Sequence, residues 1–173
     1  MSARERDSRC NGPLSELRVG LGVDAHAFAE GVPLVLGGVP FESPRGLAGH
    51  SDGDVIAHAL IDALLGAANL GDIGTLFPSH DERWRGASSL DLLASAYADV
   101  RAAGWELVNA DCVLLGEEPR IAASRDEMRE RLARALGVAG ERVAVRATTT
   151  DGLGFAGRRE GLAATAVALV GRA

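Results

Sequence analysis

The chain has 173 residues, 47% of them hydrophobic and 24% charged, and its formal net charge at pH 7 is −6. This balance is ordinary for a globular protein, and no apolar run approaches the roughly 20 residues that a membrane span requires. All 18 basic residues are Arg, mostly interleaved with Asp and Glu, so we expect neither a nucleic-acid surface nor a membrane contact.

The length fits one domain whose core needs neither disulfides nor a structural metal. Residues 1–16 are polar and lack the apolar centre of a signal peptide, so we interpret them as a flexible leader. Residues 17–173 are then the single predicted domain. The two cysteines, Cys10 and Cys112, do not suggest a disulfide pair, which favours a reduced, cytoplasmic setting.

The first half of the chain predicts a strand, a hairpin and a helix in that order: residues 18–24, residues 33–41 around Gly37-Gly38, and residues 53–68. Ser51 or Asp52 can cap this helix. The second half predicts alternating elements: a helix at 88–103, a strand at 105–115, a helix at 121–136, and strands at 143–149 and 162–170. We therefore predict an α+β two-layer sandwich, with a mixed four-stranded sheet, helices on one face and a small β-hairpin.

Three side chains in the first half indicate a metal site. Asp24 and His26 stand two residues apart on the first strand, so both point to the same face. His58 lies in the helix at 53–68, which is apolar at nearly every other position and is therefore expected to be buried. One carboxylate and two imidazoles with a fourth position open suit a catalytic zinc. A hydrogen-bonded polar cluster in the core is the alternative, because such groups are costly to bury unpaired.

The same helix carries a polar stripe, since Asp54, His58 and Asp62 occupy positions i, i+4 and i+8. His50 and Ser51 precede the helix, whose N-terminus favours anions, so His50 is either an ordinary loop residue or a donor to a phosphate. His80 has no partner at an informative spacing and is expected at the surface.

A second cluster is the run Thr148-Thr149-Thr150-Asp151, followed by a glycine-rich segment. Hydroxyl groups and backbone donors there can bind a diphosphate, and the carboxylate can hold Mg²⁺. Threonine runs are also common in ordinary strands, so this run alone leaves both interpretations open.

Five motifs follow one another along residues 18–170: Gly22-Val23-Asp24-Ala25-His26, His50-Ser51-Asp52-Gly53-Asp54, Asp62-Ala63-Leu64-Leu65-Gly66-Ala67, Gly71-Asp72-Ile73-Gly74, and Arg146-Ala147-Thr148-Thr149-Thr150-Asp151 with Gly154-Phe155. Together they resemble the 2-C-methyl-D-erythritol 2,4-cyclodiphosphate synthase family of the non-mevalonate isoprenoid pathway. No single motif would make this resemblance specific. The order of all five along nearly the whole chain makes it so.

The resemblance implies a role for each matching residue. The zinc ligands would be Asp24, His26 and His58. A further carboxylate, Asp151, would hold a second divalent ion, Mg²⁺ or Mn²⁺. The methylerythritol phosphate end of the substrate would contact seven residues: His50, Ser51, Asp62, Asp72, Ile73, Gly74 and Phe77. The cytosine would be enclosed by the stretch from Glu117 to Ala122, in which Pro119 and Arg120 are central and Ile121 follows them. The cytidine and the diphosphate would contact Ala147, Thr148 and Thr149.

Members of this family are homotrimers with their sheets facing the axis and their active sites between subunits, so the resemblance implies the same here. Phe155 and Arg158 would line a cavity on that axis. The implied reaction is the attack of the 2-phosphate of 4-diphosphocytidyl-2-C-methyl-D-erythritol 2-phosphate on the β-phosphorus, which releases CMP and closes a cyclic diphosphate. One zinc per subunit with Mg²⁺ or Mn²⁺ would screen the two anionic groups. His50 and Thr149 are expected to be catalytic, and no protein nucleophile is required. Asp54 is expected to orient His58 or a neighbouring group.

This chain departs from the usual family pattern at four positions. Asp151 stands where Glu is usual, Arg120 and Arg146 stand where Lys is usual, and Ser79 stands where an Asp often binds a substrate hydroxyl. Arg keeps the charge of Lys but not its geometry. None of these changes touches the expected zinc ligands, so we expect activity with altered affinity.

Two other functions remain open on the residues alone. A zinc phosphohydrolase could use the same ligands on a different phosphate ester. A non-catalytic trimer that binds isoprenoid diphosphates, with a purely structural metal, could also carry these motifs.

Overall fold

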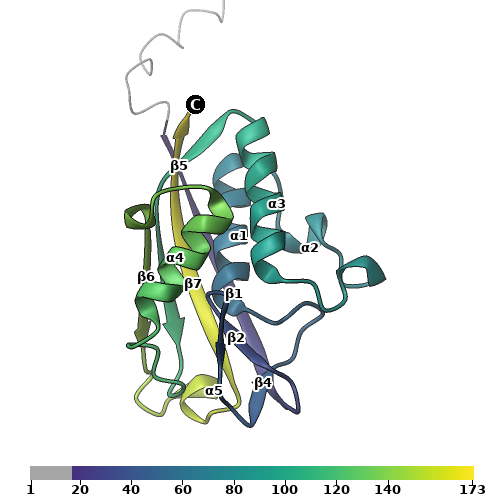
Figure 1. Ribbon diagram of the computed structural model, residues 1–173, viewed down its shortest axis with the longest axis vertical. Helices are drawn as coiled ribbons and strands as arrows, with labels where there is room; N and C mark the ends of the chain where they lie inside the picture. Colours follow the sequence, from purple (N-terminus) through teal and green to yellow (C-terminus); the bar gives the residue numbers. More distant parts are fainter. Residues whose placement is uncertain (1–16) are drawn as a thin grey trace, which may run out of the picture.

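The computed structural model describes residues 17–173, so the predicted leader at 1–16 and Cys10 lie outside the described range. Seven strands, five helices and two short 3₁₀ helices follow one another along this range (Figure 1). They are β1 (Leu17–Glu30), β2 (Leu34–Leu36), β3 (Val39–Phe41), β4 (Arg45–Leu47), α1 (Val55–Ala68), α2 (Ile73–Leu76), η2 (Glu82–Trp84), α3 (Ser89–Ala102), β5 (Trp105–Leu115), α4 (Arg125–Leu136), η3 (Gly140–Arg142), β6 (Val143–Thr148), α5 (Gly154–Gly157) and β7 (Gly161–Arg172).

The main sheet has five strands in the order β4-β1-β7-β5-β6, and the predicted number of four was wrong. β5 and β6 are parallel, whereas the other neighbours are antiparallel, so the sheet is mixed as expected. The fifth strand is β4, which pairs with the end of β1 because β1 continues to Glu30, beyond its predicted end at Asp24. β2 and β3 form the predicted hairpin, and Gly37 and Gly38 at its turn both have positive φ, 56° and 74°.

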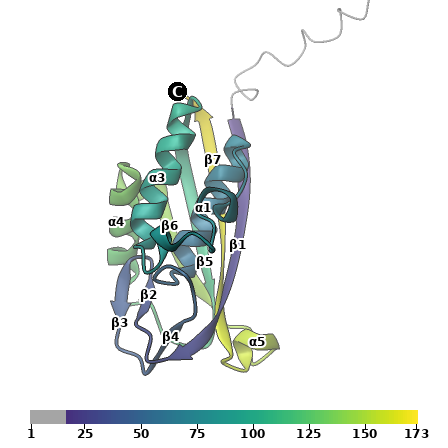
Figure 2. The same ribbon diagram turned by 90° about the vertical axis from the view of Figure 1, so that its right-hand side faces the viewer.

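The long helices cover one face of the sheet, and α1 lies between the sheet and α3 (Figure 2). The opposite face is apolar but uncovered: Val19, Leu21 and Val23 of β1 are 67%, 66% and 62% exposed. The mixed α+β class with helices on one face is therefore confirmed. Among residues 17–173, no helix is both long enough and apolar enough to cross a membrane.

Two glycines let α1 lie directly on β1. A Cβ atom added to Gly20 would lie 1.9 Å from the carbonyl oxygen of Ala63, and one added to Gly22 would lie 1.9 Å from that of Ala59. Both distances are impossible for real atoms, so any side chain at either glycine would push the helix away. Because Asp24 and His26 continue the same face of β1, this close approach brings α1 next to them.

Asp54 begins α1 and also fastens the hairpin to it. Its carboxylate accepts hydrogen bonds from the backbone N–H groups of Gly37 (2.9 Å), Gly38 (2.6 Å), Ile56 (3.1 Å) and Ala57 (3.2 Å). Burial raises the pKa of Asp54 to about 6, although the backbone donors offset part of this effect. The helix thus starts at Val55 with Asp54 as its N-cap, and the predicted start at 53, capped by Ser51 or Asp52, was wrong.

Candidate active site

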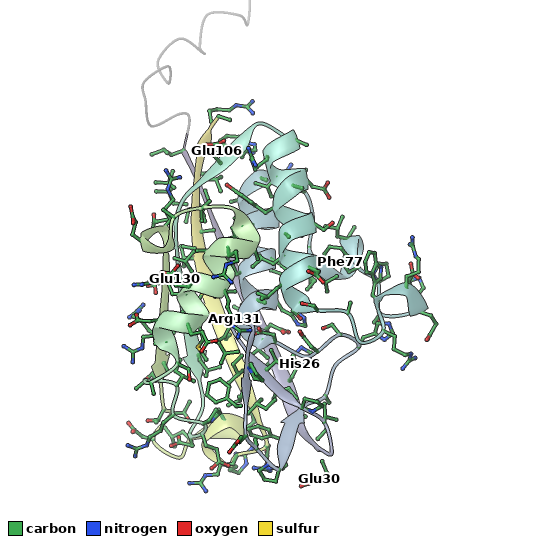
Figure 3. All side chains as sticks on the ribbon, viewed as in Figure 1. His26, Glu30, Phe77, Glu106, Glu130 and Arg131 are labelled. Carbon is green, nitrogen blue, oxygen red and sulfur yellow. The ribbon has the colours of Figure 1, made fainter. Side chains whose placement is uncertain are left out.

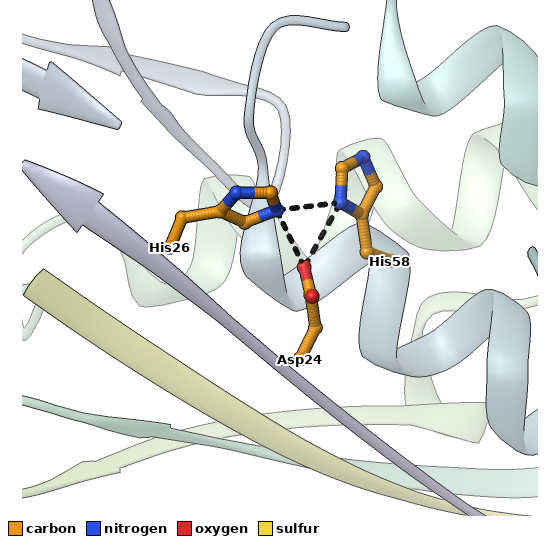
Figure 4. Close-up of side chains that lie close together, drawn as sticks. All are labelled: Asp24, His26 and His58. Atoms are coloured by element: carbon orange, nitrogen blue, oxygen red, sulfur yellow. Dashed lines mark hydrogen bonds and ion pairs between the residues drawn. The ribbon is translucent and has the colours of Figure 1, made fainter. Parts of the chain in front are cut away.

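Three side chains from β1 and α1 converge on one point (Figure 4). Asp24 Oδ2 lies 2.9 Å from both His26 Nε2 and His58 Nδ1, and these two ring nitrogens lie 3.2 Å apart. Tetrahedral ligands about 2.1 Å from a zinc ion would be separated by roughly 3.4 Å. The observed triangle is therefore close to the size that one small divalent cation requires, as the sequence predicted for Asp24, His26 and His58.

The electrostatics of this triangle favour an ionised carboxylate. Burial acts to raise the pKa of Asp24, but hydrogen bonds and opposite charge from His26 and His58 outweigh it and hold the pKa well below its usual value. The pKa of His26 is raised, chiefly by its hydrogen bond to Asp24, although burial opposes the shift. A proton shared by these groups competes with a cation for the same lone pairs, which makes cation binding dependent on pH.

The ring of His58 is held from its far side. Its Nε2 lies 3.0 Å from Ser51 Oγ and 2.9 Å from Ser89 Oγ, and Ser89 is fully buried. Asp52 in turn accepts from the Ser89 hydroxyl and, at 3.0 Å, from the Ser89 backbone N–H. An Nε2–H donated to this cluster leaves Nδ1 free to bind a cation. Asp54, expected to orient His58, does not do so, because its carboxylate is used by backbone donors.

The triangle opens into a pocket of about 460 Å³. Eight of the predicted site residues line it: Asp24, His26, His50, Ser51, His58, Ile73, Gly74 and Phe77. Figure 3 labels two of them: His26 comes from β1, and Phe77 directly follows α2. Two other predicted residues stabilise the wall instead: Asp62 accepts from Ile73 N–H at 2.7 Å, and Asp72 caps α2 by accepting from Thr75 N–H at 2.7 Å.

His50 is fixed in the pocket wall by the loop that follows α2. Its ring Nε2 lies 3.1 Å from the carbonyl oxygen of Asp81, and its own carbonyl accepts from Gly86 N–H at 2.8 Å. Because the ring donates Nε2–H to Asp81, Nδ1 is the nitrogen left for a ligand, and it can donate to an anionic oxygen only when it also carries a proton.

Sequence reasoning missed several lining residues: Thr75, Pro78, His80, Trp84 and Leu92. His80, expected only at the surface, is exposed and also lines this pocket. The sequence offered one indication that His80 lies near the site: it directly follows Ser79, a position where relatives often have an Asp that binds the substrate. Ser89 was missed as well, because nothing in the sequence brings it to His58.

The second predicted cluster lies elsewhere on the chain, and none of its residues lines the pocket. Thr148, Thr149 and Asp151 are exposed at the end of β6, where Thr149 Oγ1 donates to Asp151 Oδ1 at 3.2 Å. Several of the remaining predicted contacts are also exposed: Arg120, Ala122, Ala147, Phe155 and Arg158. Pro119 is half-buried and Ile121 is buried. Within one chain, the structure therefore separates the two predicted halves of the site.

The sequence matches the model of the YgbB family over residues 17–171. The chain belongs to the YgbB family. A family member from Rubrobacter xylanophilus, 2-C-methyl-D-erythritol 2,4-cyclodiphosphate synthase, is 60% identical over 159 residues, which cover 90% of this chain and 96% of the relative. The protein of the same name from Moorella thermoacetica is 55% identical over 89% of this chain and 94% of the relative.

Solved structures of YgbB relatives share the fold. The bifunctional IspDF of Campylobacter jejuni aligns with a TM-score of 0.88 at 43% identity, over 91% of this chain and 43% of that one. A 2C-methyl-D-erythritol-2,4-cyclodiphosphate synthase structure described as a bound form with CDP aligns with a TM-score of 0.80 at 40% identity, over 88% of this chain and 99% of that one. The chain is thus a member of an enzyme family, and its resemblance to these synthases is confirmed.

Proposed function

We propose that this protein is a metal-dependent 2-C-methyl-D-erythritol 2,4-cyclodiphosphate synthase, a phosphorus-oxygen lyase. It converts 4-diphosphocytidyl-2-C-methyl-D-erythritol 2-phosphate to the cyclic diphosphate and CMP. An oxygen of the 2-phosphate forms the new bond to the β-phosphorus, and the bond from that phosphorus to the bridging oxygen of CMP breaks. The observation that carries the proposal is the convergence of Asp24, His26 and His58 at a pocket in a chain 60% identical to a synthase.

Two groups of residues have different roles at the cation. Asp24, His26 and His58 would hold one Zn²⁺, which supplies Lewis-acid stabilisation of the reacting phosphates. Ser51 and Ser89 keep the His58 ring in place, so the ligand needs no rearrangement when substrate arrives.

His50 is proposed to touch the 2-phosphate and is assigned as catalytic. Its contact with Asp81 supports this role, because it fixes the direction of Nδ1. Ser51, Ile73, Gly74 and Phe77 would bind the methylerythritol end, with Asp62 and Asp72 fixing the backbone that carries them. Holding the phosphate in line with the leaving group is the main source of rate, since no protein nucleophile takes part.

The cytidine diphosphate end is proposed to bind Pro119, Arg120, Ile121, Ala122, Ala147, Thr148 and Thr149. Thr149 is the second catalytic residue, with its hydroxyl donating to the diphosphate, and Asp151 holds Mg²⁺ or Mn²⁺. A relative described with bound CDP supports this class of ligand.

These residues are proposed to complete the pocket of a neighbouring subunit in a homotrimer. Two observations support an assembly of this kind. The nucleotide-end residues do not line the pocket of their own chain, and one sheet face exposes Val19, Leu21 and Val23. Phe155 and Arg158 would then line a cavity on the trimer axis.

The buried free thiol of Cys112 supports a cytoplasmic location for this single domain, which we expect to bind neither nucleic acid nor membrane.

Incubation of the purified protein with 4-diphosphocytidyl-2-C-methyl-D-erythritol 2-phosphate, Zn²⁺ and Mg²⁺ tests the proposal. Cyclic diphosphate and CMP in equal amounts are the expected products, measured by ³¹P NMR and chromatography. Linear hydrolysis products would indicate a phosphohydrolase instead, and binding without turnover would indicate a non-catalytic binder.

A further inference from the structure

Glu117, in the loop after β5, holds the turn that follows β6. Its Oε1 accepts hydrogen bonds from the backbone N–H groups of Thr150 at 3.2 Å and Gly152 at 3.3 Å. The Thr150 hydroxyl lies 3.5 Å from the same oxygen, but it donates its single hydrogen to Leu153 O at 2.7 Å. The glutamate therefore holds the turn through two backbone N–H groups, one on each side of Asp151.

The turn has a defined shape, with positive φ at both central residues, which an Asp-Gly pair can adopt. Asp151 has φ 52° and Gly152 has φ 79°, so two consecutive residues lie in the left-handed region, the first of them with a side chain. The turn is exposed, and its other internal backbone bond is from Leu153 N–H to Thr150 O at 3.0 Å. Backbone N–H groups that point into one concavity form a site for an anionic oxygen, and here the Glu117 carboxylate fills it.

The next residue, Glu118, has a different role in the same loop. It forms ion pairs with Arg45 at 3.3 Å and Arg159 at 3.9 Å, and so it contacts other segments of the chain. Among the ion pairs of residues 17–173, Glu117 takes part in none. Its carboxylate is therefore committed to the turn, whereas that of Glu118 is not.

We propose that Glu117 is a positioning residue that fixes the turn carrying Thr149 and Asp151 and thereby sets the affinity for a nucleoside diphosphate with its divalent cation. This inference rests on the proposed function, in which Thr149 and Asp151 meet the diphosphate and its cation. Because Glu117 also lies two residues before Pro119, one carboxylate joins the loop assigned to the base with the turn assigned to the diphosphate.

The binding experiment measures CDP affinity by calorimetry with and without Mg²⁺, on the assembled, zinc-loaded protein. Glu117→Ala removes both acceptor bonds, and we expect CDP to bind about tenfold more weakly in Mg²⁺. Glu117→Gln keeps a carbonyl oxygen that can accept from the same two donors, so its affinity is expected within about threefold of wild type. Glu127→Ala, the matched control, removes an exposed ion pair with Arg131 on α4 and is expected to bind CDP as wild type does.

Amide hydrogen exchange without ligand gives a second readout that needs no activity. The amides of Thr150 and Gly152 are expected to exchange faster in Glu117→Ala, and to exchange at the wild-type rate in Glu127→Ala. Zinc content is expected to stay unchanged in both variants. In the steady state, Glu117→Ala is expected to raise KM more than it lowers kcat.

Three results would overturn the inference. One is a Glu117→Ala variant that binds CDP as tightly as wild type. The second is a Glu117→Gln variant as weak as Glu117→Ala, because negative charge rather than an acceptor for the turn would then be what matters. The third is unchanged exchange at Thr150 and Gly152 in Glu117→Ala. If the wild type makes no cyclic product, the proposed function itself is wrong, and the exchange result still decides whether Glu117 holds the turn.

Discussion

The pocket around Asp24, His26 and His58 and the turn around Asp151 differ in how they are held. The pocket side chains come from a long strand and a buried helix, and a hydroxyl cluster fixes the His58 ring from behind. The turn is exposed, has a left-handed backbone and depends on Glu117 from a separate loop. One chain thus preorganises the candidate cation site but leaves the turn proposed to bind the diphosphate exposed to solvent, which is the arrangement expected if a second subunit completes the site.

The largest effect should come from removing one ligand of the cation site. His58→Ala is expected to lower turnover by more than about 100-fold, since even changes to residues behind a metal ligand cost 10- to 100-fold. Bound zinc, measured by mass spectrometry, should fall with it, whereas the oligomer measured by light scattering should persist. Full activity in this variant would contradict metal-assisted catalysis.

The next effect tests whether the exposed residues proposed to bind the nucleotide act together with a second subunit. Leu21→Asp places a charge on the apolar sheet face, where Leu21 is 66% exposed in one chain, so folding should be retained. We expect monomers by light scattering and a loss of turnover, while one zinc per chain remains bound. A monomer with wild-type turnover would show that one chain is sufficient.

A smaller effect is expected behind the metal ligand. Ser89→Ala removes the hydroxyl 2.9 Å from His58 Nε2 and should weaken zinc binding by roughly tenfold, measured by competition with a chelator. Ser88→Ala is a matched control, because the Ser88 side chain makes no capping hydrogen bond at the start of α3. Equal zinc affinity in the two variants would remove Ser89 from the support of His58.

The smallest effect is expected at the turn itself. Asp151→Glu restores the longer carboxylate usual in the family and should change the Mg²⁺ concentration for half-maximal activity by roughly threefold, which is less than 1 kcal/mol. Zinc content should not change. A Mg²⁺ titration identical to that of wild type would exclude Asp151 as the second cation ligand.

Much of the fold could be predicted from the sequence because its elements carry strong local signals. The strand β5 was predicted at the residues where it occurs, and the hairpin around Gly37-Gly38 was predicted to begin at Pro33, one residue before β2 does. The three-residue strand β4 could not be predicted, since Arg45–Leu47 is too short for any periodicity and pairs only because β1 is long. The start of α4 was placed too early because residues 121–124 form a turn, closed by Ser124 N–H to Ile121 O at 3.0 Å.

The shared position of Asp24 and His26 was predictable because period-two spacing on a strand fixes a shared face, and the convergence with His58 confirms the predicted cluster. The role of Asp54 could not be predicted in this way. Its spacing from His58 placed it on the same helix face, but Asp54 is the N-cap, and its side chain accepts hydrogen bonds from the backbone instead. His80 was missed because its place in the pocket depends on the fold of a loop rather than on sequence spacing. The roles of Thr149, Asp151 and the other nucleotide-end residues stay predictions.

Gly20 and Gly22, which allow α1 to touch β1, also determine how far apart the two elements lie at the candidate cation site. The separation of Asp24 from His58 is the separation of strand and helix, and an added methyl group at Gly22 would have to displace the Ala59 carbonyl from 1.9 Å. A cation that clamps both elements must then stabilise the interior of the domain, so the melting temperature should report metal occupancy directly. Substitutions at the contact between α1 and β1 would therefore increase the distance between strand and helix. They would weaken cation binding without changing any of the three ligands.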